Sequence, residues 1–376
     1  MKLLIGADLV PTKSNKELFA EANVTALVGE ELLSVLQKAD YRIFNLEVPL
    51  TDKASPIEKC GPALIAPTDA IAGYKALGVD LLTIANNHIM DQGEQGLVST
   101  LKLLDENGIA RVGAGENLKE AEKPYIIYQD GKKVGVYACA EHEFSIAGES
   151  FPGANPFDPL ESPDHVATLK QQCDYVIVLY HGGKEHYRYP SPNLQKACRK
   201  LVKKGADLVI CQHSHCVGCE EKYLHGTIVY GQGNFLFDGS ASEYWLSALL
   251  LQIEDDFSIR YIPLVKTGNG VRLAQGDDAN GIMDAFFKRS REIQKSGTVQ
   301  KEYARFSESV RSHYLIGFSG INSRNILFRI INRLTGFRWE RWIVNSRYTK
   351  RKLLGIRNYI ECEAHRELVL KSLEDY

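Results

Sequence analysis

Residues 176–183 (VIVLYHGG) and 207–215 (DLVICQHSH) decide the fold class of this chain. Each holds an unbroken apolar run of at least four residues and then turns polar within one or two positions. Short runs rich in Val and Ile are typical of strands that are buried on both faces of a sheet. Three more stretches, with shorter or interrupted apolar runs, also end in polar residues and are predicted to be buried strands, namely residues 3–8 (LLIGAD), 42–47 (RIFNLE) and 81–87 (LLTIANN).

The segments between these predicted strands have helical character. Gly78, Gly108 and Gly205 directly follow three of them, as expected at the end of a helix. Strands that alternate with helices predict an α/β fold. Asp130-Gly131 predicts a hairpin turn within residues 125–139, and the β-rich chain after His215 predicts added antiparallel strands. The predicted helices span residues 30–39, 69–77, 93–107 and 193–204.

Bulk properties indicate an ordinary globular chain of 376 residues with a net charge of -2. The start, MKLLIGADLVPT, has no long apolar core, and no later run approaches the roughly 18 apolar residues of a membrane span. We therefore expect a cytoplasmic protein, with a peripheral membrane location as an alternative, whose eight cysteines are free thiols. Cys216 and Cys219 have the spacing of a redox or zinc pair, but without a second pair we favour two buried thiols.

Charge divides the chain unevenly. Residues 283–376 carry 19 Lys/Arg and 10 Asp/Glu, whereas the rest carries 26 and 37. We place a boundary at about 270–282, between a domain of residues 1–270 and a helical basic region of residues 283–376. Residues 311–357 hold 11 Lys/Arg and one acid, Glu340, interleaved with aromatic residues. This region could bind an acidic polymer or a membrane surface, or it could be a helical cap with solvated arginines; no motif for specific nucleic-acid binding is present.

Candidate metal ligands follow almost every predicted strand of the first domain. Because the carboxyl ends of strands in an open α/β sheet lie at one edge, we expect these side chains to converge. Two carboxylates, an amide oxygen and three imidazoles suit Mn, Zn or Fe better than Ca or Mg. Two such cations could share Glu47 and activate a water molecule between them. The residues at the strand ends are Asp8, Asn45, Glu47, Asn86, Asn87, His88, His181, His213 and His215.

Each candidate also has a simpler interpretation. Asp8 at a strand end could be a cap or turn residue. Asp91 could orient the imidazole of His88 or could begin the next helix as its N-cap. His213 and His215 lie on one side if their segment is extended.

Six ordered motifs resemble those of the capsule synthesis proteins of the CapA type, which are associated with poly-γ-glutamate or polysaccharide capsules and are similar to calcineurin-like metallophosphatases. The resemblance implies a four-layer α/β/β/α sandwich with two divalent metal ions at the sheet edges. The motifs are GADLVPT (6–12), FNLE (44–47), ANNHIMDQG (85–93), HGGKEHYRYPSP (181–192), GADLVICQHSH (205–215) and YGQGNFLFD (230–238).

The resemblance also implies roles for individual residues. His88 would donate a proton to the leaving group, with Asp91 behind it. Glu185 matches a family acid that has no assigned role, and Asn234 matches a position near the site that is expected to be structural. Together with the strand-end residue Asn45, these two are the candidates for lying near the substrate. Asp8, Asn87, His181, His213 and His215 would bind the metals together with Glu47 as the bridging carboxylate.

Two departures separate the chain from metallophosphatases proper. Val10 occupies the place of a histidine, and FNLE contains no aspartate where the second metallophosphatase motif has one. The capsule family shares both changes.

The leading hypothesis is a metal-dependent hydrolase of phosphoester or related anionic substrates in capsule or envelope polymer synthesis. One alternative is a non-catalytic metal-binding scaffold in a polymer-synthesis complex, and another is an amide hydrolase or transferase acting on poly-γ-glutamate. The expected partners are an anionic small molecule or polymer, and other capsule-synthesis proteins or the membrane surface through the basic region.

Overall fold

Strand β9 (Tyr175–His181) shows why the apolar runs of the sequence are unbroken. In the computed structural model, which describes residues 1–321, 325–336 and 338–373, this strand is buried on both faces. Ile177 and Leu179 belong to the core between two β-sheets. Val176 and Val178 belong to a second core beneath helices on the outside of the sheet. Both faces must therefore be apolar, and the continuous run follows from this.

Two sheets form the centre of the first unit, residues 1–303. Strands β1 to β4 are mutually parallel, as are β7, β9, β10 and β12, and antiparallel strands complete each sheet. The first sheet has the order β15 (Gly270–Leu273), β14 (Ile259–Thr267), β13 (Ser247–Ile253), β1 (Leu3–Asp8), β2 (Tyr41–Asn45), β3 (Leu81–Thr83) and β4 (Ala110–Val112). The second has the order β11 (Glu220–Tyr223), β12 (Gly226–Tyr230), β10 (Leu208–Gln212), β9, β7 (Lys132–Ala140) and β6 (Tyr125–Gln129); β5 (Ala114–Gly115) pairs separately with β8 (Gly153–Ala154).

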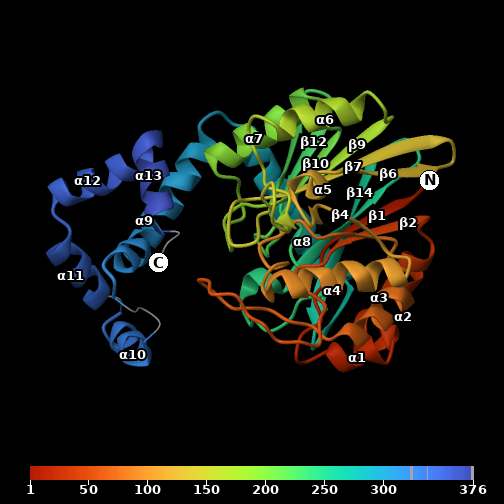
Figure 1. Cartoon of the computed structure of the whole chain (residues 1–376), viewed down its shortest axis with the longest axis horizontal. Coiled ribbons are helices and arrows are strands. Elements are labelled where there is room, and N and C mark those ends of the chain that lie inside the picture. Colours follow the sequence, from red (N-terminus) through yellow and green to blue (C-terminus); the bar gives the residue numbers. More distant parts are fainter. Residues whose placement is uncertain (322–324, 337, 374–376) are drawn as a thin grey trace. The chain divides into compact units, whose positions relative to one another are not determined.

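Helices cover the outer face of each sheet (Figure 1). On one side lie α6 (Ser162–Lys170) and α7 (Pro192–Lys203), and on the other lie α1 (Lys16–Ala20), α2 (Val24–Gln37), α3 (Ile71–Ala76) and α4 (Gly93–Glu106). The predicted four-layer α/β/β/α sandwich is confirmed. The short helices η1 (Thr68–Ala70), α5 (Leu118–Ala121) and η2 (Glu243–Trp245) lie in connections.

The hairpin predicted around Asp130-Gly131 joins β6 to β7, and both turn residues have positive φ angles of 52° and 74°. The chain between residues 270 and 303 differs from the prediction. Helix α8 (Gly276–Ile293) begins before residue 283, where the helical region was expected to start, and α9 (Thr298–Phe318) follows it after Gly297. Since α8 packs against β11 and β14, the first unit extends to Tyr303, beyond the boundary expected at 270–282.

The second unit, residues 304–376, is helical within its described residues. It has a small core of its own, made by Leu315, Ile316, Phe328, Ile343 and Val344. Within the described residues, no helix combines the length and apolar character needed to cross a bilayer. After α9, its helices are α10 (Ile326–Leu334), α11 (Arg338–Arg347), α12 (Lys350–Glu361) and α13 (Glu363–Leu373).

Candidate metal centre

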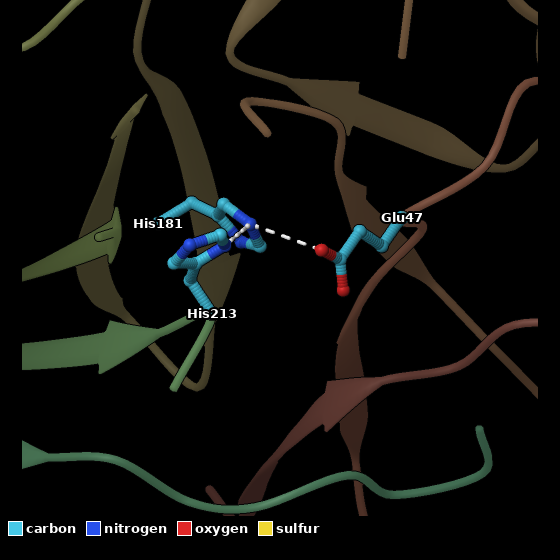
Figure 2. Close-up of side chains that lie close together, drawn as sticks. All are labelled: Glu47, His181 and His213. Carbon is cyan, nitrogen blue, oxygen red and sulfur yellow. Dashed lines mark hydrogen bonds and ion pairs between the residues drawn. The ribbon is translucent and has the colours of Figure 1, made fainter. Parts of the chain in front are cut away.

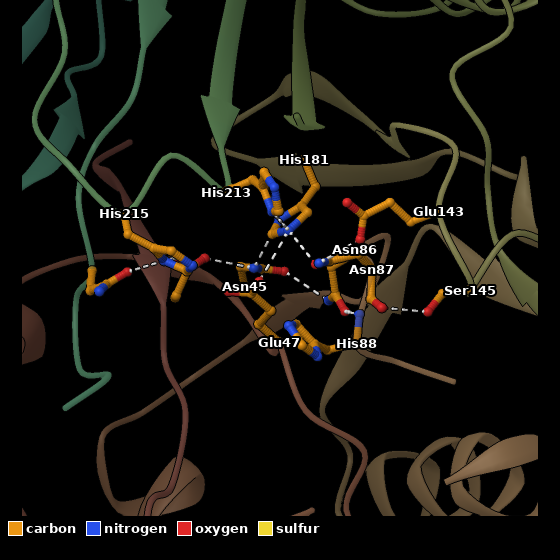
Figure 3. Close-up of polar contacts among 12 residues, drawn as sticks. Asn45, Glu47, Asn86, Asn87, His88, Glu143, Ser145, His181, His213 and His215 are labelled. Atoms are coloured by element: carbon orange, nitrogen blue, oxygen red, sulfur yellow. Dashed lines mark hydrogen bonds and ion pairs between the residues drawn. The ribbon is translucent and has the colours of Figure 1, made fainter. Parts of the chain in front are cut away.

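The ends of parallel strands from both sheets bring the candidate ligands to one place. Asp8 is the last residue of β1 and pairs in register with Asn45 at the end of β2. His181 is the last residue of β9 and pairs with Gln212 at the end of β10, directly before His213. Figure 3 shows that the side chains of the two sheets face one another across this edge.

Glu47, His181 and His213 form the first group of potential ligands (Figure 2). The Nε2 atom of His181 lies 3.2 Å from Glu47 Oε1 and 3.1 Å from His213 Nδ1. It also lies 3.0 Å from Oδ1 of Asn87. Ligand atoms that share one ion at about 2.0–2.2 Å are separated from each other by roughly 3.0–3.5 Å. The spacing of these atoms therefore fits a common cation.

Asp8, Glu47 and His215 form a second group. Asp8 Oδ2 lies 3.4 Å from His215 Nδ1, and that nitrogen lies 2.8 Å from Oδ1 of Asn234. Asn45 donates from Nδ2 to Asp8 Oδ1 at 2.7 Å. Glu47 is common to both groups, which is the arrangement needed for a carboxylate that bridges two metal ions.

The electrostatics of this edge favour bound cations. Both carboxylate oxygens of Glu47, and Oδ2 of Asp8, are buried without a hydrogen-bond partner among the described residues. Burial and the neighbouring charge of Asp8 raise the pKa of Glu47 to about 8. Burial lowers the pKa of His181 to about 3, so its imidazole is neutral and can offer a lone pair. Because an uncompensated buried carboxylate is costly, the residues present fit divalent metal ions.

His213 and His215 reach the site through an unusual backbone. Their φ angles are 84° and 53°, in the left-handed region that residues other than glycine rarely adopt. The expectation of an extended segment was therefore wrong: two left-handed turns after β10, rather than strand alternation, direct both imidazoles inward. Strain of this kind persists where the surrounding structure fixes it, often at functional sites. Cys216 and Cys219 follow this turn as buried free thiols, as predicted.

His88 and Asp91 make a separate pair beside the ligand groups. Nδ1 of His88 lies 2.6 Å from Asp91 Oδ2. The other oxygen of Asp91 accepts a hydrogen bond from Lys59 at 2.6 Å, and Oδ2 also accepts from the backbone N–H of Leu64 at 2.6 Å. Asp91 does not cap α4, whose N-cap position is Gln92. The carboxylate is instead fully engaged in holding His88 and Lys59.

The three residues expected near the substrate lie in different environments. Asn45 is fully buried, and besides its bond to Asp8 it accepts one from Asn86 Nδ2 at 3.1 Å. Asn234 contacts the imidazole of His215. Glu185 is exposed and lies 3.6 Å from the Lys184 ammonium. Asn45 and Asn234 are therefore placed to hold ligands, and only Glu185 is open to solvent.

Four residues that contact the site residues were not identified from the sequence. Asn87 donates to Glu143 at 2.9 Å, and its carbonyl accepts from the Ser145 hydroxyl at 2.7 Å (Figure 3). Both residues follow β7, so the strand-end pattern could have identified them. Lys59 and Trp245 gave no comparable signal because they lie outside the strands. Trp245 lies 4.7 Å from the ring of His215 and donates to Nε2 of His186 at 2.9 Å.

Comparison with known proteins identifies a family for the part of the chain that contains this site. Residues 3–239 match the sequence model of the family described as bacterial capsule synthesis protein PGA_cap. The chain belongs to this capsule synthesis family. The match spans every candidate site residue from Asp8 to Asn234 and excludes the second unit.

The chain is about 30% identical to two individual members of this family. The chain is 31% identical over 226 residues to capsule biosynthesis protein CapA of Bacillus anthracis, covering 57% of this chain and 54% of the relative. It is 30% identical over 212 residues to PGA biosynthesis protein CapA of Bacillus subtilis (strain 168), covering 54% and 55%. The chain thus spans about half the length of these relatives. A solved hypothetical protein from Thermus thermophilus is similar with a TM-score of 0.46 and 12% identity, over 71% of this chain and 100% of the other.

Proposed function

We propose that this chain is a metal-dependent hydrolase that acts on a phosphoester or related anionic substrate during capsule polymer synthesis. The observation that carries the proposal is the position of Glu47. It is fully buried, its oxygens have no hydrogen-bond partner among the described residues, and it belongs to both ligand groups. A buried carboxylate in such a place is stabilised by metal ions rather than by protein donors.

Different residues of the chain would bind the two cations. Glu47, His181, His213 and Asn87 would hold one cation, and Asp8, Glu47 and His215 would hold the other. Bound divalent cations would supply Lewis acidity that neutralises charge on a phosphoryl oxygen and promotes ionisation of water near neutral pH. Asn45 and Asn234 fix the side chains of Asp8 and His215 through the hydrogen bonds described above.

His88 would act as the proton donor. Asp91 occupies its Nδ1 atom, which leaves Nε2 for a substrate oxygen. With Asp91 holding the imidazole at Nδ1, His88 would protonate a departing alkoxide from Nε2. Lys59, whose Nζ atom lies 2.6 Å from Asp91 Oδ1, holds that carboxylate in place through an ion pair.

The biological setting is supported by the family. The similar proteins from two Bacillus species are described as capsule and PGA biosynthesis proteins. A polymer of that kind, or its phosphorylated or otherwise anionic precursors, suits a site that combines metal ligands with two cations, Lys184 and Arg188, in the segment after His181.

The test uses full-length chain stripped of metal and reloaded with Mn, Zn or Fe. We expect generic phosphoesters to be hydrolysed only after reloading, and the activity to disappear in Glu47→Ala and His213→Ala. Activity that survives both substitutions would refute the mechanism. Tight binding of metal without turnover of any ester or of poly-γ-glutamate would instead indicate a scaffold, and shortening of poly-γ-glutamate without phosphate release would indicate an amide hydrolase.

A further inference from the structure

Helix α10 (sequence ILFRIINRL) has a strongly apolar side that is exposed to solvent, although such a side is usually buried against a core. Phe328 and Asn332 face inward, where Phe328 contacts Trp339 and Asn332 bonds to Glu340. At 100° per residue the remaining apolar side chains fall on one arc of about 140°. These residues, which we name the outer face of α10, are all exposed: Ile326 (71%), Leu327 (65%), Ile330 (49%), Ile331 (40%) and Leu334 (81%).

The segment that contains this helix is rich in cations. Residues 311–357 contain 11 Lys/Arg and a single acid, Glu340. Glu340 is half-buried and turned toward Asn332, with its Oε2 2.5 Å from Asn332 Nδ2. Among the described residues of this span, the surface therefore carries cations without exposed carboxylates. Trp342 on α11 is also largely exposed at 65%, as is common for aromatic residues at a membrane interface.

We propose that the outer face of α10, with the neighbouring cations of α10 and α11, docks on an anionic lipid bilayer. A helix with one strongly apolar side and basic flanks lies in the plane of a membrane surface, its apolar side in the acyl boundary. The described helices are unable to span a bilayer, which agrees with a surface position. A second copy of the chain fits less well, because its identical cations would repel. Nucleic acid would neutralise the cations but would leave the apolar arc in water.

Sedimentation of the full-length chain with lipid vesicles tests this proposal. We expect binding to vesicles of phosphatidylcholine and phosphatidylglycerol in equal parts, little binding to phosphatidylcholine alone, and release by salt. The fluorescence of Trp342 should shift to the blue on binding, and Trp342→Phe should reduce that shift.

Paired substitutions separate the two contributions. Ile330→Gln with Leu334→Gln should weaken binding more than about tenfold while the helical circular dichroism is retained, since neither side chain belongs to the small core. Arg333→Gln with Arg338→Gln should weaken binding roughly fivefold per cation. A matched control is Leu160→Gln with Leu224→Gln, two equally exposed residues of the first unit at 77% and 71%, which should bind like the parent chain.

Several results would overturn the proposal. These are a lack of binding to phosphatidylglycerol vesicles, equal binding to neutral vesicles, or an equal loss in the control pair. The same conclusion would follow if the outer-face pair abolished self-association measured by analytical ultracentrifugation, or if duplex DNA bound with the same dependence on these residues while vesicles did not.

Discussion

Replacing Glu47 by Gln should change the stability of the chain in opposite directions with and without metal. Glu47 is fully buried and its oxygens have no hydrogen-bond partner among the described residues. In the metal-free chain Gln keeps the shape of the side chain but has no proton to lose, so the variant avoids the cost of keeping Glu47 protonated when the folded chain is at neutral pH. Its amide nitrogen can also donate to His181 Nε2, which lies 3.2 Å from the Oε1 position of Glu47. We therefore expect the variant without metal to be more stable than the parent chain.

The magnitude follows from the pKa of Glu47, which is raised from 4.5 to about 8. Below pH 4.5 the carboxyl is protonated in both folded and unfolded chains and has no effect. Between 4.5 and 8 the unfolded chain releases this proton but the folded chain retains it, so stability falls as pH rises. At pH 7 the resulting penalty is on the order of 3 kcal/mol, and Glu47→Gln should remove most of it.

With metal the order reverses. A bound ion stabilises the parent chain by about 4.1 kcal/mol at a thousandfold excess over the Kd, which exceeds the penalty of about 3 kcal/mol, and the neutral Gln cannot bridge two cations. Urea unfolding at several pH values, after chelation and after reloading with Mn, measures both effects. Glu221→Gln is the matched control: Glu221 is buried but accepts bonds from Arg199 and Tyr230, so its replacement should destabilise both forms. A metal-free Glu47→Gln chain that is less stable than the parent would refute the reasoning.

The remaining predictions concern the proton donor, the backbone near the histidines and the cysteines. His88→Asn and Asp91→Asn should each lower kcat by about 10²- to 10⁴-fold without changing the metal content, measured by phosphoester turnover beside elemental analysis; loss of metal would contradict this assignment. Gly218→Ala should destabilise the chain by about 4 kcal/mol or more, because a Cβ there would lie 1.6 Å from the carbonyl oxygen of Tyr230. An unchanged Tm would contradict this close approach between the loop after His215 and Tyr230. Cys219→Ala should retain the full metal content, whereas a loss would favour a thiolate ligand.

The layers of the fold could be predicted from the sequence because each buried strand has a distinct signal. Residues 176–179 are continuously apolar since β9 is covered on both faces, and Asp130-Gly131 specifies its turn through local conformation. The end of the first unit could not be found in this way. Helix α8 has a polar outer side and several basic residues near Arg289. The charge distribution along the sequence therefore assigned most of this helix to the basic C-terminal region. Its packing on β11 and β14 is a tertiary contact that local sequence does not encode.

The site was partly predictable for the same reason. Glu47 and His181 are close together because parallel strands end at a common edge, and this is a property of the topology. The orientation of His213 and His215 depends on left-handed backbone angles, which nothing in the sequence HSH indicates. Lys59 comes from a long connection, and only the folded chain shows that its ammonium meets Asp91.

Counting metal ions in single-ligand variants tests the central claim most directly. The two ligand groups share Glu47 but differ in their histidines, His213 in one and His215 in the other. Elemental analysis of full-length chain should therefore find two equivalents in the parent, about one in His213→Ala, about one in His215→Ala and none in Glu47→Ala. A parent chain that binds no metal after reloading, or a Glu47→Ala chain that retains both ions, would contradict a shared dinuclear centre.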